Sequence, residues 1–415
     1  MIREQFEMSG RYKQWAYALV GVGVLSLMLG YIFLHPNAEG EGNHLGATKY
    51  WAVLMHNSIF FLLVSIASMF FIGVTTMAMG GWQLAFRRVP EAISGFVYIG
   101  GIIALIVLLG YVWFSHDHNI YHWKDTEHVA HDKVLNWKKG FLNKNFFTVA
   151  TILVIGAWML LRTMHRKNSL AEDMGTKGDR SYFWKAIIIC AAFIVIYGLT
   201  VGSTTPWLWL MSIDAHWFST MYSWYTFASS WVAGVSLMML FVVYLKNQGY
   251  LEFVNEEHIH DIGKFMFAFS VFWTYLWFSQ YMLIWYSNQP EETEYFQPRL
   301  LGPYRGIFFL NLIINFLSPL LILMKRGSKR NYTVVTFMAV VLIFGHWLDF
   351  YQMIMPGPLK GDVNGGNTIG LFVFDLGVAL GFVGLILLVT AKYLAKAALL
   401  PRNHPFVKES IIHHT

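Results

Sequence analysis

Long apolar segments dominate this chain, and they constrain its fold more than any other feature. Ten of them are separated by turns that carry almost all of the charge. A helix needs roughly 17 to 25 residues to cross about 30 Å of hydrocarbon, and each segment is near or above that length. Only helices and closed barrels satisfy every backbone group inside a membrane, and the alternating ten-residue segments of a barrel are not found in this sequence. The segments cover residues 15–35, 58–80, 94–114, 146–164, 186–202, 218–245, 265–287, 303–324, 332–355 and 368–391.

This pattern predicts an all-α polytopic membrane protein with ten transmembrane helices. We expect a tail at residues 1–14, a ten-helix membrane domain at 15–395 with a long outer loop at 115–145, and a mobile tail at 396–415. Charged residues make up only 13% of the chain, about half of what a soluble domain carries. The net charge of +6 comes from basic residues at helix ends, not along one polar face, which argues against nucleic acid as a partner.

The distribution of basic residues predicts the orientation. Lys and Arg are more numerous in the tails and turns on the side of the N-terminus than on the other side, so we expect both termini to be cytoplasmic. The first apolar segment lacks a clear signal-peptide cleavage site, and we expect it to remain as a span. The lone cysteine, Cys190, lies inside the fifth segment. The chain by itself can therefore form neither a disulfide nor a Cys-based haem c, zinc or iron–sulfur site.

The apolar segments differ in the ionisable residues that they contain. Segments two to five hold Ser, Thr, Tyr and Gly but no carboxylate or histidine, and such residues mostly serve helix packing. In contrast, His346, Asp349 and Asp375 lie within the last two segments. A charge at the bilayer centre costs roughly 2.5 to 3.5 kcal/mol on insertion scales, and such residues usually mark a functional site. We predict that these three form one proton-exchanging cluster in the outer half of the membrane; the alternative is a lock that fastens the last two helices together.

Further candidates lie near the outer ends of the helices. Asp214 and His216 follow an expected break at Pro206, where a histidine can exchange protons with water; anchoring of the loop by tryptophans is the alternative. Gln280 offers an amide to a quinone carbonyl or to another helix, and His216 is the second candidate quinone contact. The loop at 115–145 has five histidines without the spacing of a known zinc motif. We interpret it as an interfacial segment and predict no metal site.

Three stretches of the chain resemble the NrfD-like, or polysulfide reductase, family of ten-span membrane subunits. They are GGWQLAFRRVPEAI at 80–93, SIDAHWFSTMYSWYTFASS at 212–230 and TYLWFSQYMLIWYSNQPEET at 274–293. The likeness covers nearly the whole chain and is greatest to the membrane subunits of alternative complex III, a quinol:cytochrome c oxidoreductase. It implies two four-helix bundles, formed by segments two to five and six to nine and flanked by segments one and ten.

The resemblance also implies partners and cofactors in a bacterial inner membrane. The partners would be a sibling NrfD-like subunit, an iron–sulfur subunit, c-type cytochromes, small membrane subunits and a terminal oxidase. Menaquinol would be oxidised near the outer surface, and haem c and iron–sulfur clusters in the partner subunits would carry the electrons. One departure matters: the family's Trp-x-Glu-Arg is replaced by Trp347, Leu348, Asp349 and Phe350. Because the arginine is missing and the first bundle lacks ionisable groups, we expect the sibling subunit to oxidise quinol, and this chain to be a scaffold that exchanges protons.

Two other functions compete with this interpretation. A secondary transporter also places charges within broken helices, but it usually carries matched repeats, and His346 with Asp349 has no counterpart in the first half of the chain. A b-type cytochrome needs two histidines that face each other across a bundle. His56 and His165 are instead expected at segment ends on opposite sides of the membrane.

Overall fold

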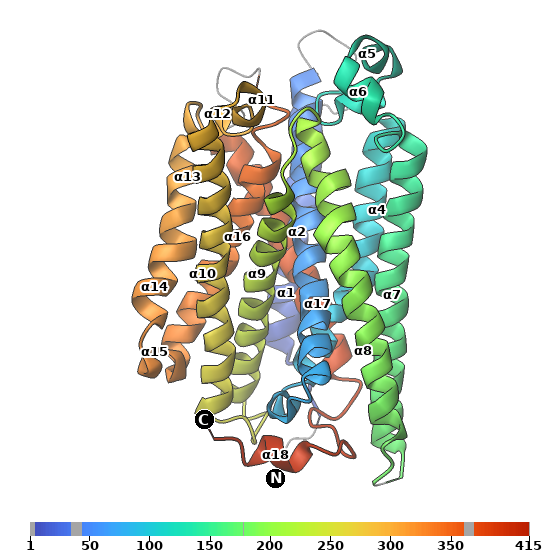
Figure 1. The fold of residues 1–415 in the computed structure, drawn as a ribbon. Coiled ribbons are helices and arrows are strands. Elements are labelled where there is room, and N and C mark those ends of the chain that lie inside the picture. Colours follow the sequence, from blue (N-terminus) through green and yellow to red (C-terminus); the bar gives the residue numbers. More distant parts are fainter. Residues whose placement is uncertain (1–4, 35–43, 177, 361–368, 415) are drawn as a thin grey trace.

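The computed structural model describes residues 5–34, 44–176, 178–360 and 369–414, most of them in helices that lie alongside one another (Figure 1). Within these ranges nine helices are long and apolar enough to cross a membrane, and the only β pairing is an isolated bridge between Gln5 and Ala398. This confirms the predicted all-α polytopic class. The nine are Gly10–Leu34, Leu45–Met77, Arg88–Phe114, Lys144–Met174, Ser181–Asp214, Thr220–Asn247, Arg305–Leu323, Tyr332–Ile354 and Ile369–Leu394.

Long helices run the length of the molecule, and short ones close its two ends (Figure 1). The long ones are α1 (Gly10–Leu34), α2 (His44–Met77), α4 (Val97–Phe114), α7 (Lys144–Met174), α8 (Ser181–Leu199), α9 (Thr220–Asn247), α10 (Glu256–Ser287), α16 (Tyr332–Ile354) and α17 (Ile369–Leu394). The short ones are α3 (Arg88–Ile93), α5 (Thr126–His131), α6 (Lys133–Lys138), α11 (Pro290–Thr293), α12 (Gln297–Leu300), α15 (Arg326–Arg330) and α18 (Val407–Ile411). A further rod is made of α13 (Arg305–Leu312), the π turn η7 (Ile313–Leu317) and α14 (Ser318–Leu323).

The predicted seventh segment, 265–287, is helical within α10 but is not among the nine candidate spans. It is rich in Trp, Tyr and Ser and contains Gln280, and hydropathy scales score these residues as less apolar than Leu, Ile or Val. The expected end of the first segment at His35 and the expected start of the tenth at Thr368 lie outside the described residues.

Two predicted boundaries are wrong, and both matter for the site. Helix α2 begins at His44 and not at the predicted residue 58, because the mixed polar and apolar residues at 44–57 continue the same helix. The chain also does not break at Pro206. After α8 it continues through the π turns Thr200–Thr204 and Pro206–Leu210 and a 3₁₀ turn to Asp214. A π turn inserts an extra residue and so accommodates a proline ring, which lacks an N–H, without ending the helix.

Asparagine and aspartate side chains fix the starts of several helices. The Asn331 side chain accepts hydrogen bonds from the backbone N–H groups of Thr333 and Val334 at the start of α16. Asn143 caps α7, and Asn255 forms a capping box with His258 at the start of α10. Such caps satisfy N–H groups that have no partner within the helix.

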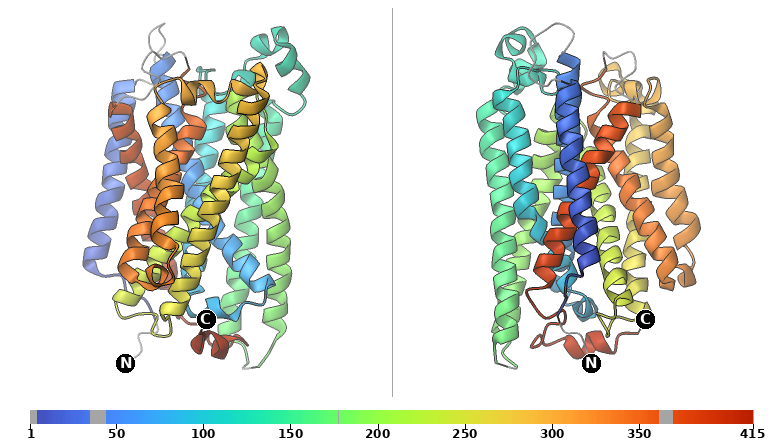
Figure 2. Two further views of the ribbon diagram at one scale, coloured as in Figure 1. Left: turned by 60° about the vertical axis from the view of Figure 1, so that its left-hand side comes forward. Right: turned by 180° about the vertical axis from the view of Figure 1, so that it is seen from behind.

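The helices pack around α2, which contacts α4, α8 and α9, while α7 packs against α4 and α8. On the other side, α9 packs against α10 and α16. The most extensive contact joins α1 to α17, which cross each other (Figure 2). A Cβ on Gly23 would lie 2.4 Å from the Cα of Gly381, so glycine at these positions allows the two backbones to touch.

Both termini lie at one end of the molecule, and the loop containing α5 and α6 lies at the other (Figure 1). The expected mobility of the tail at 396–415 is contradicted by the described part of that tail, which packs across the first end. The Ser410 hydroxyl donates to the carbonyl of Trp82 and accepts from the N–H of Ala85, each at 2.8 Å. The Asn403 side chain donates to the carbonyl of Gly175 at 2.8 Å. These contacts fix the tail beneath α7 and the segment before α3.

Candidate functional site

Asp349 lies in α16 with no solvent exposure and is held by side chains of two neighbouring helices. Its Oδ2 accepts hydrogen bonds from Ser229 Oγ of α9 at 2.7 Å and from Trp273 Nε1 of α10 at 2.9 Å. Its Oδ1 accepts from the hydroxyl of Tyr225 in α9. Three neutral donors therefore surround one carboxyl group. Neutral donors soften the cost of burying a carboxylate but bring no opposite charge, so this group can exist in either protonation state.

His346 lies one turn before Asp349 on the same helix face, as their spacing predicts. Its Nδ1 lies 3.0 Å from Ser229 Oγ, so a single hydroxyl bridges the histidine and the carboxyl group. The Trp273 ring packs edge-on against the imidazole, with 5.5 Å between ring centroids. Within the described residues His346 Nε2 has no hydrogen-bond partner, and the same is true of both amide atoms of buried Asn315. Asn315 lies in η7, which packs against α16.

Asp375 does not join His346 and Asp349 but lies against α2. Its Oδ2 is 2.9 Å from His56 Nδ1, and its Oδ1 accepts from Asn57 Nδ2 at 2.5 Å. All three side chains are fully buried. The backbone carbonyl of Trp347 lies 2.9 Å from His56 Nε2, and the Trp347 indole N–H donates to Asn57 Oδ1 at 3.1 Å. The predicted cluster is thus divided into two groups on different faces of α16.

The hydrogen bonds of His56 require a shared proton. Nε2 faces a carbonyl, which only accepts, so it must carry a hydrogen. Nδ1 faces the carboxyl group of Asp375, and a proton is needed between these two atoms as well. Either the imidazole is doubly protonated beside a carboxylate, or a neutral imidazole accepts from a protonated Asp375. The pair holds one proton that can move between two named atoms.

A polar route connects Asp349 with the end of the molecule that carries α11 and α12. Tyr225, which donates to Asp349, lines a cavity of about 20 Å³ together with Gln280, Arg299 and Gln352. A cavity of this size holds about one water molecule. Gln280 Nε2 and Gln352 Oε1 are buried there without a hydrogen-bond partner among the described residues.

Arg299 continues this route toward the surface. It is 2% exposed, and its Nη2 lies 3.7 Å from the carboxylate of Asp214. Asp214 in turn pairs with Lys360 Nζ at 2.8 Å, and Lys360 reaches the partly exposed Glu294 at 3.1 Å. Burial alone would lower the pKa of Lys360, but the nearby carboxylates of Asp214 and Glu294 raise it. Asp214 is therefore part of a buried ion-pair network, and not a freely solvated loop residue.

His216 is separate from these groups. Its Nε2 lies 2.6 Å from Asp132 Oδ2 in the loop between α5 and α6, and its side chain is 42% exposed. Burial would raise the pKa of Asp132, but hydrogen bonds from the Leu135 N–H and from His216 lower it. His216 thus helps to hold the loop at 115–145 in place. Within the described ranges no three His, Cys, Asp or Glu side chains come together as a metal site.

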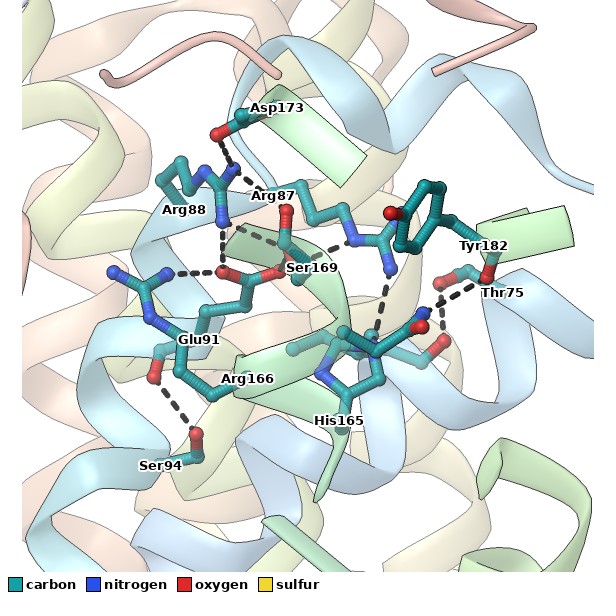
Figure 3. Close-up of polar contacts among 12 residues, drawn as sticks. Thr75, Arg87, Arg88, Glu91, Ser94, His165, Arg166, Ser169, Asp173 and Tyr182 are labelled. Carbon is teal, nitrogen blue, oxygen red and sulfur yellow. Dashed lines mark hydrogen bonds and ion pairs between the residues drawn. The ribbon is translucent and has the colours of Figure 1, made fainter. Parts of the chain in front are cut away.

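A second buried network, which the sequence analysis missed, lies where α3 meets α7 (Figure 3). Glu91 of α3 is 1% exposed and faces three guanidinium groups. Arg88 Nη1 lies 2.7 Å and Arg87 Nε 3.4 Å from its carboxylate, and Arg166 of α7 also pairs with it. Ser169 Oγ donates to Glu91 at 2.6 Å. The network ties α3 to α7.

Further contacts extend this network. His165 Nε2 lies 3.0 Å from Arg87 Nη2, and Asp173 of α7 pairs with Arg88. The expectation that the first bundle lacks ionisable groups is wrong, since Arg162 lies within the predicted fourth segment and is 3% exposed. His56 and His165 are also buried, in α2 and α7, just outside the bounds of the predicted second and fourth segments. A b-type haem would need two free imidazole nitrogens from facing helices, and both nitrogens of His56 are engaged. The polar pair His56–Asn57 was the signal available in the sequence.

Comparisons with protein-family models and with curated proteins gave no match. The family therefore remains a proposal that rests on the three stretches named above. The structure places the stretch at 212–230 against Asp349, and the stretch at 274–293 begins directly after Trp273, the donor to Asp349 from α10. The stretch at 212–230 supplies Asp214, Tyr225 and Ser229, and the stretch at 274–293 supplies Gln280. The third, at 80–93, supplies Glu91 and its two neighbouring arginines.

Proposed function

We propose that the chain is an integral membrane subunit of a respiratory quinol:cytochrome c oxidoreductase of the alternative complex III type, most like ActF, the smaller of its two NrfD-like subunits. In this proposal α10 is the tenth span, the helices form two four-helix bundles flanked by α1 and α17, and both termini are cytoplasmic. The observation that carries the proposal is that the stretch at 212–230 supplies two of the three donors to one buried carboxyl group, Asp349, and that the stretch at 274–293 begins directly after the third donor, Trp273.

Within that complex the chain serves as a scaffold that exchanges protons through Asp349. Three features support this role. The carboxyl group is surrounded by neutral donors, His346 shares Ser229 with it, and the cavity beside Tyr225 leads to Arg299 and Asp214. The ionisable groups and a water molecule in the cavity would pass protons between Asp349 and the surface.

The proposal places the redox groups in other subunits. Cys190 is buried and is the one cysteine of the chain, so haem c and iron–sulfur clusters would be held by partners. The arginine of the family's Trp-x-Glu-Arg is absent from this chain, where Asp349 is followed by Phe350, and Gln280 and His216 stay the candidate contacts for any menaquinol that the chain meets. We therefore expect quinol oxidation in the sibling NrfD-like subunit, beside the iron–sulfur subunit.

Copurification tests the assignment. A tagged chain, solubilised in mild detergent from its native membrane, should bring down c-type haem, an iron–sulfur protein and a second ten-span subunit, and the preparation should oxidise menaquinol. A preparation that contains the chain alone would refute the assignment and would favour a secondary transporter, for which substrate-driven proton flux in proteoliposomes is the assay.

Substitution of Asp349 tests its role in proton exchange. Asp349→Asn keeps the shape and the hydrogen-bond acceptor but removes the titratable proton, so the complex should assemble and lose at least about tenfold in proton release or turnover. Asp349→Leu should impair assembly because it leaves three buried donors unpaired. Glu127→Gln, in the exposed outer loop, is the control. Full turnover and unchanged proton release in Asp349→Asn would refute the role.

A further inference from the structure

The crossing of α1 and α17 leaves a groove at the end of the molecule that carries the termini. The two helices touch where Gly23 meets Gly381, and they cross each other (Figure 2). Toward the termini a groove of about 720 Å³ lies between α1, the residues just before it and α17. A groove between two spans at this level is open to the lipid headgroup region of a membrane.

The charge of this groove is strongly positive. Its lining residues include Lys13 of α1, Lys392 of α17 and Lys396, and all three lysines are exposed. Glu7 is the one carboxylate among the lining residues that the structure describes. In the described ranges none of the three ammonium groups lies within 4.0 Å of a carboxylate. Their charges are therefore available to an anion that enters the groove.

The residues of α1 and α17 that line the groove have the same order from the terminal end inward: first a lysine, then a larger apolar or aromatic residue. Lys13 and Tyr17 are four residues apart in α1, and Leu388 and Lys392 are four apart in α17, so each pair shares one face of its helix. The lysines lie toward the terminal end, and Tyr17 and Leu388 lie one turn farther into the apolar part. Trp15 and Tyr17 are 73% and 63% exposed, as is typical of aromatic residues at a membrane interface.

We propose that this groove binds the headgroup of an anionic phospholipid, with its phosphate between Lys13, Lys392 and Lys396. The acyl chains would then run past Tyr17 and Leu388 along the exposed apolar face of α1. Basic pockets between spans are suited to anionic headgroups because each lysine near the membrane surface attracts them. A free phosphate ion would use the same lysines, but it would leave the adjoining apolar residues without a function.

Lipid binding to the purified chain, or to the complex with which it purifies, tests the proposal. Native mass spectrometry in detergent would follow titration with dioleoyl phosphatidylglycerol or with dioleoyl phosphatidylcholine. We expect phosphatidylglycerol to bind at least about tenfold more tightly. The triple variant Lys13→Gln, Lys392→Gln and Lys396→Gln should weaken phosphatidylglycerol binding about a hundredfold and leave phosphatidylcholine binding unchanged.

A matched control removes the same charge at the same end of the molecule. Lys167→Gln, Lys185→Gln and Lys325→Gln alter three exposed lysines outside the groove and should leave binding as in the parent chain. The single variant Lys392→Gln should weaken binding about fivefold and serves if the triple variant is poorly produced. Equal losses in the two triple variants would overturn the proposal. So would displacement of the lipid by an equal concentration of inorganic phosphate, because the site would then be one for a free anion.

Discussion

Removal of the charge of Glu91 is the change whose effect on stability follows most directly from the structure. The carboxylate is 1% exposed and pairs with Arg88 at 2.7 Å, with Arg87 at 3.4 Å and with Arg166. Glu91→Gln preserves the shape of the side chain and an oxygen that can accept from Ser169. The substitution leaves three buried guanidinium groups without the charge of Glu91. Among the described residues, the carboxylate that still pairs with one of them is Asp173, which lies beside Arg88.

The expected loss is about 3–5 kcal/mol, the usual cost of removing one partner from a buried ion pair. Charge alone would give a larger loss in the free energy of unfolding. One ion pair at about 4 Å contributes about 4 kcal/mol at an effective dielectric constant of 20, and Glu91 faces three guanidinium groups. The partial exposure of Asp173 at 14% provides solvation that limits the loss. The expected loss in the free energy of unfolding therefore follows from the geometry of one carboxylate that several arginines share.

Equilibrium unfolding in mixed detergent micelles, followed by tryptophan fluorescence, would measure this difference in the free energy of unfolding. Glu252→Gln is the matched control, because the Glu252 side chain is exposed. The hydrogen bond that Lys246 Nζ donates to Glu252, at 3.0 Å, goes to the backbone carbonyl, which the substitution keeps. Its effect should stay within about 0.5 kcal/mol. A loss below about 1 kcal/mol for Glu91→Gln would refute the view that this network is a structural lock between α3 and α7.

Two further predictions concern the ends of the molecule. A cysteine introduced at exposed Glu127 should react with an impermeant maleimide in intact cells, since Cys190 is buried and adds little background; reaction only after lysis would reverse the proposed topology. Burial, with Arg87 nearby, lowers the pKa of His404 from 6.5 to about 3, so the docked tail binds fewer protons than the free tail and loses stability as the pH falls below 6.5. Amide exchange is itself slower at low pH, so the protection factor, which corrects for the intrinsic rate, is the quantity to compare. Around Phe406, whose N–H donates to His404 at 3.3 Å, the protection factor should be about 30-fold lower at pH 5 than at pH 7.5, and His404→Asn should remove this dependence. Equal protection factors at both pH values in the parent chain would contradict it.

The fold class and the position of Asp349 could be predicted from the sequence because both depend on local properties. Segment length and apolar composition determine which helices can span, and the cost of a buried carboxylate marks its position as unusual. The spacing of His346 and Asp349 was also sufficient to place them on one face. Their partners Tyr225, Ser229 and Trp273 could not be predicted, since these come from helices whose contacts with α16 no local pattern specifies.

The remaining errors share one physical cause. His56 and Asp375 are 319 residues apart in the chain, so their pairing depends on the packing of α2 and α17 and has no local signature. Glu91 lies in a stretch that reads as a charged turn, and charges in turns are normally solvated. The tail after residue 395 is polar enough to suggest mobility, yet Ser410 docks it by hydrogen bonds with backbone groups of the segment before α3.

The division of the predicted cluster changes how α16 can act. Asp349 and His346 face α9 and α10, whereas the adjacent Trp347 contacts the His56–Asp375 pair through both its carbonyl and its indole. A change in the proton shared by His56 and Asp375 alters a hydrogen bond to the backbone of α16 itself. Helix α16 therefore contacts both groups, His346 and Asp349 with their partners on one face and the His56–Asp375 pair through Trp347 on another, although the described structure shows no direct hydrogen bond between the groups.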